Sequence, residues 1–350
     1  MRLLAETLDY FSKYSIFELR EILKKRVQEH EVLPNILVVD TNELTQDAVI
    51  LTLFSETIKS FFLEIGKWTV TNPQDMYTKA LEVEWYNLLD PNLTFAIRPM
   101  VKDPKTMKEI GKNVGQAVVD VMTRETGIRP KVNLSNPDIE IMAWLVENEL
   151  ILALNLCGDE LNGDEEILAR SLIIASDWDK HSSLGEIFYA GISTSALRYA
   201  LNDARRERLR YRSFVKLPLI DRQKVLELAS KNWKRDIPLE IVCYERLGRL
   251  QLVKEEAPEV RKIALRDVNK LSECNESLLI SNFIIALEKK SEQIDWVKKL
   301  PELLRGNKNW RTLVLLARED VINEFNLNNK QYEKDIIFKG IRAKMVKYVR

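Results

Sequence analysis

Two groups of basic side chains have the types and spacing to bind a charged partner. In the first, Lys105, Lys108 and Lys112 fall on one face of an expected helix. Residues 98–131 hold eight basic and four acidic side chains, a local excess of positive charge. A row of ammonium groups on a helix suits a polyanion. The alternative is an ordinary solvated helix face, which is what most charge runs are.

The second group lies in residues 198–216, which hold seven basic and two acidic side chains with Tyr211 and Phe214 among them. Guanidinium groups bind phosphates in a bidentate manner and stack on bases, so this segment predicts a nucleic-acid contact. A helix laced with ion pairs to Asp203 and Glu207 is the equally weighted alternative.

Composition limits the classes of function. The 350 residues carry 53 Lys and Arg against 53 Asp and Glu, so nucleic-acid affinity has to come from local patches. The cysteines Cys157, Cys243 and Cys274 and the histidines His30 and His181 show no metal-ligand spacing, and we expect no metal. The apolar runs are too short to span a bilayer and no signal peptide is evident, so the expected location is the cytoplasm.

The elements that position the first basic group follow from apolar patterning. Buried strands are predicted at Leu93–Ile97, Ile139–Val146 and Leu150–Leu156. A helix is predicted over Thr106–Glu125, with a start signal at Asp103-Pro104 and a stop signal at Gly127. Its apolar positions at helical spacing are Met107, Ile110, Val114, Val118, Val121 and Met122.

The first 90 residues alternate between strand and helix patterns. Strands are expected at Met1–Thr7, Ile36–Asp40 and Thr57–Trp68, and helices at Ile16–Val27, Glu43–Ser55 (capped by Asn42) and Pro73–Leu89. This order fits the β-α-β-β-α-β arrangement of a ferredoxin-like domain.

The order of these parts resembles a THUMP domain, an RNA-binding module of tRNA- and rRNA-modifying enzymes. The resemblance rests on T-F-A-I-R-P at 94–99, the Gly111/Gly115 helix, N-P-D at Asn136–Asp138, and Cys157-Gly158 followed by Leu161. It implies a ferredoxin-like domain over 1–90, a THUMP-like domain over 91–163, and tRNA or another structured RNA as partner. The RNA-binding residues then expected are Arg98, Lys102, Lys105, Lys108, Lys112, Arg129, Lys131, Arg205, Arg206, Arg208, Arg210 and Arg212.

Residues 164–350 alternate helices and strands, which predicts a doubly wound α/β sheet of the Rossmann-like type. Ligands of such sheets lie at the carboxyl ends of the strands. A strand, turn and helix are expected within Glu186–Ala200. The other expected helices are Ile167–Ser176 and Ile294–Leu304, and the other strands are Pro238–Tyr244, Ile263–Leu265, Leu278–Ile280, Thr312–Ala317 and a strand-like tail at Ile337–Tyr348.

This second half resembles the methyltransferase domain of THUMP-containing RNA methyltransferases, above all the tRNA guanine-N2 methyltransferases. That family carries D-P-x-C-G-S-G-T after its first strand, where this chain has E-I-F-Y-A-G-I-S from Glu186, with Gly191 shifted. The resemblance assigns cofactor contacts to Glu186, Gly191, Glu245 and Asp267. It places Asn282 at the start of the family's N-P-P-Y base clamp, where the chain reads N-F-I-I.

Three hypotheses follow from the kept framework and the altered motifs. The first is a non-catalytic tRNA-binding protein that needs no cofactor. The second is an active methyltransferase that uses S-adenosylmethionine and Asn282. The third is a structural subunit of a separate catalytic methyltransferase. Binding of S-adenosylmethionine separates the second hypothesis from the other two.

Overall fold

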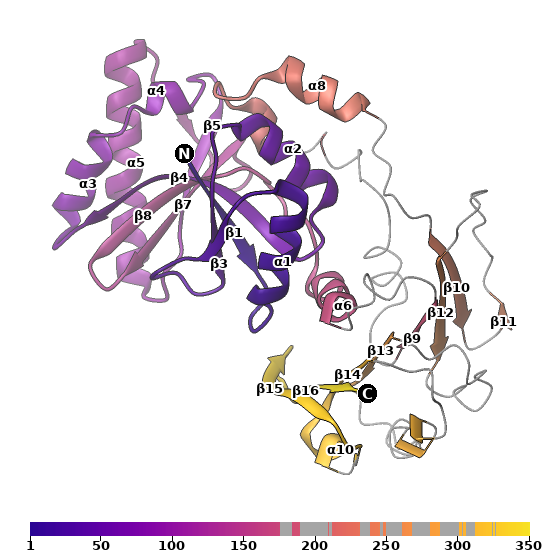
Figure 1. The fold of residues 1–350 in the computed structure, drawn as a ribbon. Helices are drawn as coiled ribbons and strands as arrows, with labels where there is room; N and C mark the ends of the chain where they lie inside the picture. The colour runs from indigo at the N-terminus through magenta and orange to yellow at the C-terminus, as the bar shows by residue number, and fades with distance from the viewer. Residues whose placement is uncertain are drawn as a thin grey trace. The chain divides into compact units, whose positions relative to one another are not determined.

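The computed structural model forms two compact units (Figure 1). It describes residues 1–175, 184–189, 209, 212–231, 239–245, 248–249, 261–267, 281–287, 301–302, 304–305, 312–323, 325 and 327–350. Unit 1 contains Met1–Leu8, Ser15–Gly163 and the described part of Ala204–Asn232. Unit 2 contains Asp9–Tyr14 and the described parts of Asp164–Asp203 and Trp233–Arg350.

Unit 1 is built on one eight-stranded mixed sheet, in the order β2-β3-β1-β4-β8-β7-β5-β6. Its strands are β1 (Arg2–Thr7), β2 (Val27–Glu29), β3 (Ile36–Asp40), β4 (Ile58–Thr69), β5 (Thr94–Pro99), β6 (Lys131–Val132), β7 (Ile139–Val146) and β8 (Glu149–Asn155). Its helices are α1 (Ser12–Leu23, which begins in residues grouped with unit 2), α2 (Leu44–Phe54), α3 (Pro73–Leu81), α4 (Trp85–Leu88), α5 (Pro104–Thr126), the short 3-10 helix η3 (Ser213–Lys216) and α8 (Arg222–Ser230).

Strand β4 joins the two halves of this sheet. Its first half pairs with β1 and its second half pairs with β8, for example Leu63 with both Leu3 and Leu154. The register shifts between Glu64 and Gly66, where a Cβ on the glycine would lie 2.5 Å from the Trp68 ring. The predicted ferredoxin-like and THUMP-like domains therefore share one continuous sheet, and their division near residue 90 stays a prediction.

Helix α5 begins and ends at the predicted signals. The Asp103 carboxylate accepts hydrogen bonds from Thr106 N at 2.8 Å and Thr106 Oγ1 at 2.6 Å, which caps the first turn. Gly127 ends the helix in the left-handed region at φ 71°. The predicted apolar positions are buried except Met107, which is 40% exposed. Helices α3, α4 and α5 lie together (Figure 1).

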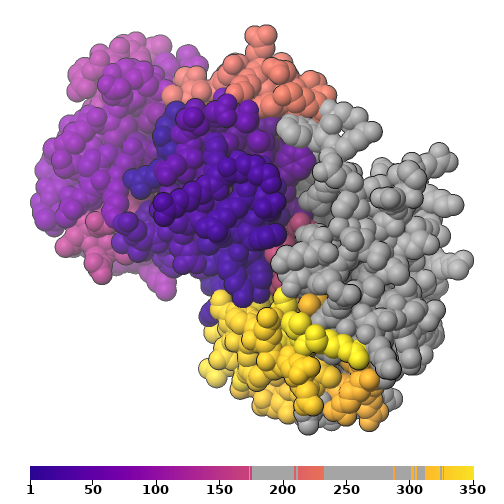
Figure 2. All heavy atoms as spheres, viewed as in Figure 1, coloured from indigo at the N-terminus to yellow at the C-terminus, as the bar shows by residue number. Residues whose placement is uncertain are grey.

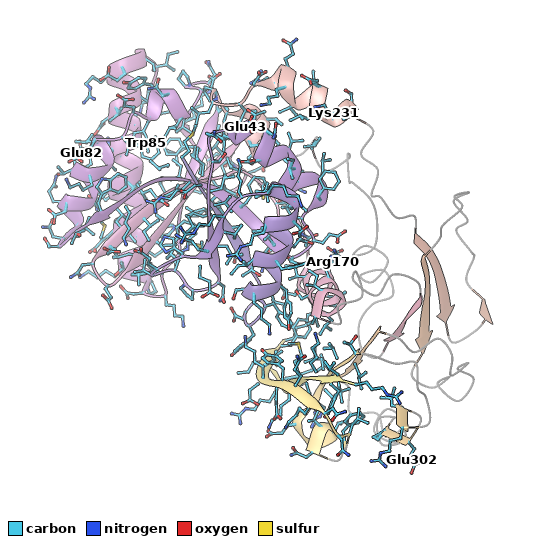
Figure 3. The ribbon with its side chains drawn as sticks, in the orientation of Figure 1. Glu43, Glu82, Trp85, Arg170, Lys231 and Glu302 are labelled. Carbon is cyan, nitrogen blue, oxygen red and sulfur yellow. The ribbon has the colours of Figure 1, made fainter. Side chains whose placement is uncertain are left out.

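Several predicted helix boundaries are wrong. The helix expected over Pro73–Leu89 breaks between α3 and α4, where the buried Trp85 indole donates to the Ala80 carbonyl at 2.8 Å (Figure 3). The helix expected to end at Val27 stops at Leu23, and Lys24 follows it with φ 55°. Asn42 does not cap α2, because Glu43 is the cap residue and makes no side-chain cap bond.

Unit 2 contains the second eight-stranded sheet, in the order β11-β10-β12-β9-β13-β14-β16-β15. Its elements are α6 (Asp164–Ala175), β9 (Leu184–Tyr189), β10 (Leu239–Glu245), β11 (Gly248–Arg249), β12 (Arg261–Asp267), β13 (Ser281–Ala286), β14 (Thr312–Arg318), α10 (Glu319–Asn323), β15 (Lys330–Phe338) and β16 (Ile341–Val349). Strands β10, β12, β9, β13 and β14 are parallel, and the strand order reverses between β9 and β13. The α/β fold class and the Rossmann-like sheet are confirmed.

The carboxyl-terminal strands differ from the prediction of one strand-like tail. β15 and β16 form an antiparallel hairpin around a two-residue turn, with Lys339 at φ 47° and Gly340 at φ 77°. Positive φ at both turn residues matches the twist of the flanking strands. The helix expected at Ile294–Leu304 lies mostly outside the described residues.

Residues 212–231 pack on unit 1, although their sequence position is between β9 and β10 of unit 2. Phe214 is fully buried, with its ring centroid 6.4 Å from that of Phe61. Lys224 on α8 lies 3.6 Å from the carboxylate of Glu43, the residue just before α2. In the space-filling view this segment covers part of the unit 1 surface (Figure 2). The prediction that residues 164–350 form one domain did not anticipate this return.

Candidate nucleic-acid interface and candidate cofactor edge

The exposed side of α5 and the turn before it carry a row of lysines. Lys102, Lys105, Lys108 and Lys112 are all exposed, and the opposite side of the helix is buried on the sheet. Within the described ranges, no hydrogen bond or ion pair to an acid occupies any of these four ammonium groups. The amino end of α5 adds the positive end of the helix dipole nearby. We call these four residues the α5 basic face.

Two further predicted residues lie at the edge strand of the same sheet. Arg129 and Lys131 are exposed. Lys131 belongs to β6, the outermost strand, and pairs there with Thr94 of β5. Val132 and Leu134 beside them are 54% and 67% exposed. The predicted basic residues that follow α5 are therefore open to solvent at the sheet edge.

Arg98 is placed differently from the lysines. Its Nε lies 2.6 Å from Glu140 Oε1, and its Nη1 donates to the Leu134 carbonyl at 2.9 Å. Glu140 also accepts from Asn155 Nδ2 at 3.0 Å. These bonds tie the end of β5 to β7 and to the loop after β6, so Arg98 has a bracing role in the domain itself.

The N-L-S-N-P-D loop is held by its own side chains and by β5. Asn133 Oδ1 accepts from the backbone N–H groups of Ser135 and Asn136 at 3.2 and 3.1 Å. The Asp138 carboxylate accepts from Thr94 N at 3.0 Å and Thr94 Oγ1 at 2.8 Å. The N-P-D motif thus fixes the loop against the first residue of β5.

Lys216 completes this arrangement from a distant part of the chain. Its Nζ lies 2.8 Å from Asp138 Oδ1. The bond from Lys216, together with the two bonds from Thr94, lowers the pKa of Asp138 to about 2. Sequence patterning missed this pair, because 78 residues separate its members and no local signal links them.

The described end of the second basic group is packed rather than open. Arg212 is buried and donates to the Asp159 carbonyl at 2.6 Å and to the Cys157 carbonyl at 3.4 Å. Arg205, Arg206, Arg208 and Arg210 lie outside the described residues. Of this group, Arg212 therefore serves to hold η3 against the end of β8.

Two predicted cofactor contacts lie at the carboxyl edge of the unit 2 sheet. Glu245 is the last residue of β10, and Asp267 is the last residue of β12. Their strands are neighbours in parallel register, with Cys243 opposite Leu265. Asp267 also stands opposite Tyr189, the last residue of β9. Both residues therefore lie at the edge where such sheets bind ligands.

Glu186 and Asn282 do not lie at that edge. Glu186 is the third residue of β9 and pairs with both Ala264 and Asn282. The predicted strand end at Asn282 is wrong, because β13 starts at Ser281 and continues to Ala286. Asn282 thus lies near the amino end of its strand. Gly191 falls outside the described residues.

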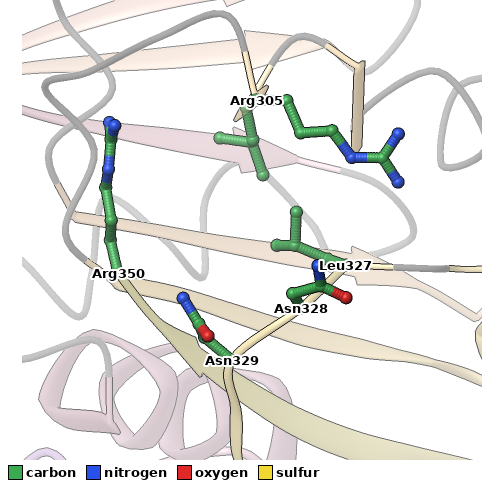
Figure 4. Close-up of a pocket in the computed structure, with 6 residues that line it drawn as sticks. Arg305, Leu327, Asn328, Asn329 and Arg350 are labelled. Carbon is green, nitrogen blue, oxygen red and sulfur yellow. The ribbon is translucent and has the colours of Figure 1, made fainter.

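A pocket of about 180 Å³ lies elsewhere in unit 2 (Figure 4). Its lining residues are Leu304, Arg305, Leu327, Asn328, Asn329 and Arg350. Because Val349 pairs with Thr312, the first residue of β14, this pocket is at the amino ends of the parallel strands. It is therefore separate from the carboxyl edge that holds Glu245 and Asp267.

Metal sites and membrane-spanning helices are two further features that we looked for among the described residues. Among these residues, no three His, Cys, Asp or Glu side chains are grouped so that they could hold a metal ion. None of the helices in that part of the chain has the length and apolar character needed to cross a membrane.

Comparison with known proteins finds a domain match within the first unit. Residues 70–155 match the THUMP domain, which indicates RNA binding. The chain is 26% identical over 145 residues to the ribosomal RNA large subunit methyltransferase K/L of Buchnera aphidicola, covering 38% of this chain and 21% of that protein. It is 31% identical over 121 residues to the tRNA (guanine(6)-N2)-methyltransferase of Methanocaldococcus jannaschii, covering 30% of this chain and 31% of that protein. The matched region spans about a fifth to a third of these relatives.

Solved structures share the fold along the whole chain. A possible methylase from Clostridium difficile 630 matches with a TM-score of 0.73 and 14% identity, over 99% of this chain and 97% of that one. TrmN from Thermus thermophilus matches with a TM-score of 0.62 and 13% identity, over 100% and 99%. SMU.472, solved in complex with SAH, matches with a TM-score of 0.72 and 13% identity, over 99% and 97%. The chain thus matches the THUMP domain over residues 70–155 and is similar to RNA methyltransferases over part of its length.

Proposed function

We propose that this chain binds folded RNA, tRNA in particular, through the α5 basic face together with Arg129 and Lys131, and that its methyltransferase-like domain does not transfer methyl groups. The observation that carries the proposal is the row of exposed lysines on the THUMP match, none of which forms a side-chain ion pair with an acid among the described residues. We take tRNA as the bound RNA because one relative is named for tRNA, although another is named for ribosomal RNA.

The chemistry of the basic face favours RNA phosphates over base edges. Lysine ammonium groups act as point charges, and double-stranded RNA is recognised mainly by shape and by its phosphates and 2′-hydroxyls. Arg98 and Arg212 are left out of the proposed interface, because both guanidinium groups bond to the protein itself. The interface is thus proposed to read the outline of a helical RNA.

The absence of catalysis is proposed from the positions of the motif residues. Asn282 lies near the amino end of β13, away from the edge where a clamp on the target base is needed. The residues that follow β13 are Leu287, Glu288 and two lysines, which offer neither prolines nor an aromatic ring. This composition does not fit the family's base clamp.

The cofactor turn is altered in any register. Glu186 lies inside β9, so the family motif D-P-x-C-G-S-G-T can also be aligned one residue later, starting at Ile187. In this alignment Gly191 matches the first glycine of the motif and Thr194 matches its threonine. In that register Ile187 replaces the acid and Ser193 replaces the second glycine. Loss of the acid and of one glycine supports weak or absent binding of S-adenosylmethionine.

A second candidate function is an active RNA guanine-N2 methyltransferase. It is favoured by Glu245 and Asp267, which stand at the carboxyl edge where the resemblance expects ribose and adenine contacts. S-adenosylmethionine would supply the methyl group, and these two carboxylates would orient the cofactor by accepting hydrogen bonds. Methyl transfer to tRNA by the purified chain would favour this candidate.

A salt series tests the RNA-binding part of the proposal. Lys105→Glu, Lys108→Glu and Lys112→Glu are combined, and binding of unfractionated tRNA is followed between 50 and 200 mM salt. Because each phosphate contact adds about 0.7 to 0.9 to the slope of log affinity against log salt, we expect the slope to fall by roughly two to three.

The matched control reverses three lysines that already pair with acids. Lys24, Lys231 and Lys339 are half exposed or more and lie near Glu21, Glu227 and Glu165. Their reversal changes the net charge by the same amount. Equal slopes for both variants would contradict the role of the α5 basic face.

A further inference from the structure

The loop over residues 133–138, which we call the motif loop, leads from the edge strand β6 past β5 to the inner strand β7. It begins where Asn133 N donates to a carbonyl of β5 at 3.0 Å and ends where Asp138 N donates to the Thr94 carbonyl at 3.0 Å. Lys131 of the proposed RNA interface pairs with Thr94 as well. The motif loop is therefore joined directly to that interface through one residue of β5.

The tip of the motif loop is open to solvent. Leu134, Ser135 and Asn136 are all exposed. Hydroxyl and amide side chains can hydrogen-bond to phosphate oxygens and to ribose hydroxyls, which are the groups that a folded RNA presents most widely. The tip thus has the chemistry to extend the interface beyond its lysines, provided that the loop keeps its shape.

The shape of the motif loop depends on a contact from another part of the chain. Arg98 of β5 donates to the Leu134 carbonyl at 2.9 Å, and Lys216 of η3 lies 2.8 Å from Asp138 Oδ1. Phe214 is fully buried on unit 1, so η3 presents Lys216 from a fixed base. The hydrogen bond from Lys216 is the main cause that lowers the pKa of Asp138 to about 2, so this carboxylate stays charged at neutral pH.

The charge of Lys216 is compensated, unlike the charges on the α5 basic face. Its ammonium group and the Asp138 carboxylate form an ion pair, so together they add no net charge to the surface. A paired lysine attracts a polyanion much less than an unpaired one does. Any effect of Lys216 on RNA binding is therefore expected to act through the shape of the motif loop.

We propose that the motif loop contacts the sugar-phosphate backbone of the bound RNA, and that Lys216 is a positioning residue that holds this loop through Asp138. The proposal rests on the proposed RNA-binding function and adds a loop and a positioning residue to it. It gives residues 212–231 a part in RNA recognition, although their sequence position is between β9 and β10 of unit 2.

The test compares Lys216→Met with Asp138→Asn in the full chain, by anisotropy of fluorescently labelled, unfractionated tRNA across a salt series. The two substitutions change the net charge in opposite directions but break the same ion pair. If the pair positions the loop, both variants bind tRNA about threefold to fivefold more weakly, the range that a partly exposed ion pair sets. The double variant loses no more than either single one, because the two residues act as a unit. Lys216→Arg keeps the wild-type affinity.

The salt dependence separates positioning from direct contact. Lys216→Met is expected to keep the wild-type slope of log affinity against log salt, whereas loss of a phosphate contact lowers the slope by about 0.7 to 0.9. Lys224→Met is the matched control, because Lys224 lies in the same segment but lies 3.6 Å from Glu43 instead of pairing with the motif loop. This control should leave the affinity for tRNA unchanged.

Two results would overturn the positioning role. Tighter binding by Asp138→Asn together with a lower slope for Lys216→Met would show that Lys216 contacts a phosphate itself. Wild-type affinity in both variants would remove the motif loop from the interface. Failure of wild type to bind tRNA, or an unchanged slope after reversal of the α5 lysines, would instead overturn the proposed function.

Discussion

The α5 basic face of unit 1 and the carboxyl edge of the unit 2 sheet differ in how many of their predicted residues stand where the expected role needs them. All four lysines of the α5 basic face are exposed. At the carboxyl edge Glu245 and Asp267 stand in place, but Asn282 and Glu186 lie further back along their strands. Under the proposed function, recognition by charge is kept in this chain while catalysis by position is lost.

The physical reason is the range over which each kind of interaction acts. Charges interact over about 8 to 10 Å at moderate salt, so a lysine row tolerates changes in exact position. Methyl transfer needs the reacting atoms about 3 to 3.5 Å apart and aligned, so a displaced group loses most of its effect. A domain can therefore keep its sheet and its RNA contacts after its catalytic geometry is lost.

The largest expected effect tests whether residues 212–231 belong with unit 1. Phe214→Ala removes a fully buried ring beside Phe61 and should cost about 3 to 5 kcal/mol of unfolding free energy. Leu226→Ala on α8 is the control, because Leu226 is 72% exposed and should be nearly neutral. Urea unfolding measures both. Similar losses for the two variants would contradict the packing of this segment.

An intermediate effect concerns the link between Asp138 and Lys216. Because the folded-state pKa of Asp138 is lowered to about 2, its charge stabilises the fold above the unfolded pKa of about 4, and this stability is lost as the pH falls from about 4 to 2. With the carboxylate partly exposed, the difference between wild type and Asp138→Asn should be about 1 kcal/mol at pH 7.

Urea unfolding between pH 6 and pH 2.5 follows this difference. It should shrink towards the acid end, and Lys216→Met should reduce it at neutral pH. A difference that stays constant through the acid range would show that the charge of Asp138 does not stabilise the loop.

The smallest effect asks whether the glycines of α5 serve RNA binding or only packing. A Cβ on Gly115 would lie 3.6 Å from Ile97 Cγ1, an ordinary contact. Gly115→Ala should therefore stabilise the chain by about 0.5 to 1 kcal/mol and leave tRNA affinity unchanged. Gly127→Ala, at φ 71°, should instead destabilise it by about 1 kcal/mol. Thermal melts compare the two, and a loss of tRNA binding in Gly115→Ala would give this glycine a functional role.

Local signals in the sequence were enough for much of unit 1. The strands Ile36–Asp40 and Ile139–Val146 occur as predicted, because each is a short apolar run between polar residues. The ends of α5 follow from Asp103 and Gly127, whose side chain and backbone act within one turn. Such elements are specified by residues that are close in the chain.

The parts that sequence patterning missed depend on distant contacts. Phe214 meets Phe61, and Lys216 meets Asp138, across long stretches of chain. The wrong end of β13 came from placing Asn282 by motif resemblance instead of by apolar pattern, although Phe283–Ala286 continues the apolar run. The exposed lysines could be predicted because their helical spacing is a local pattern. The bonds of Arg98 and Arg212 could not, because their partners are distant in the sequence.

Titration calorimetry of the full chain with S-adenosylmethionine tests the central claim most directly. With the acid and one glycine of the cofactor turn replaced, the two carboxylates at the strand ends are not expected to overcome the cost of association. We predict no saturable heat at micromolar concentrations of the cofactor. Saturable binding that Asp267→Ala abolishes, followed by methyl transfer from labelled cofactor to tRNA, would contradict the account and identify an active methyltransferase.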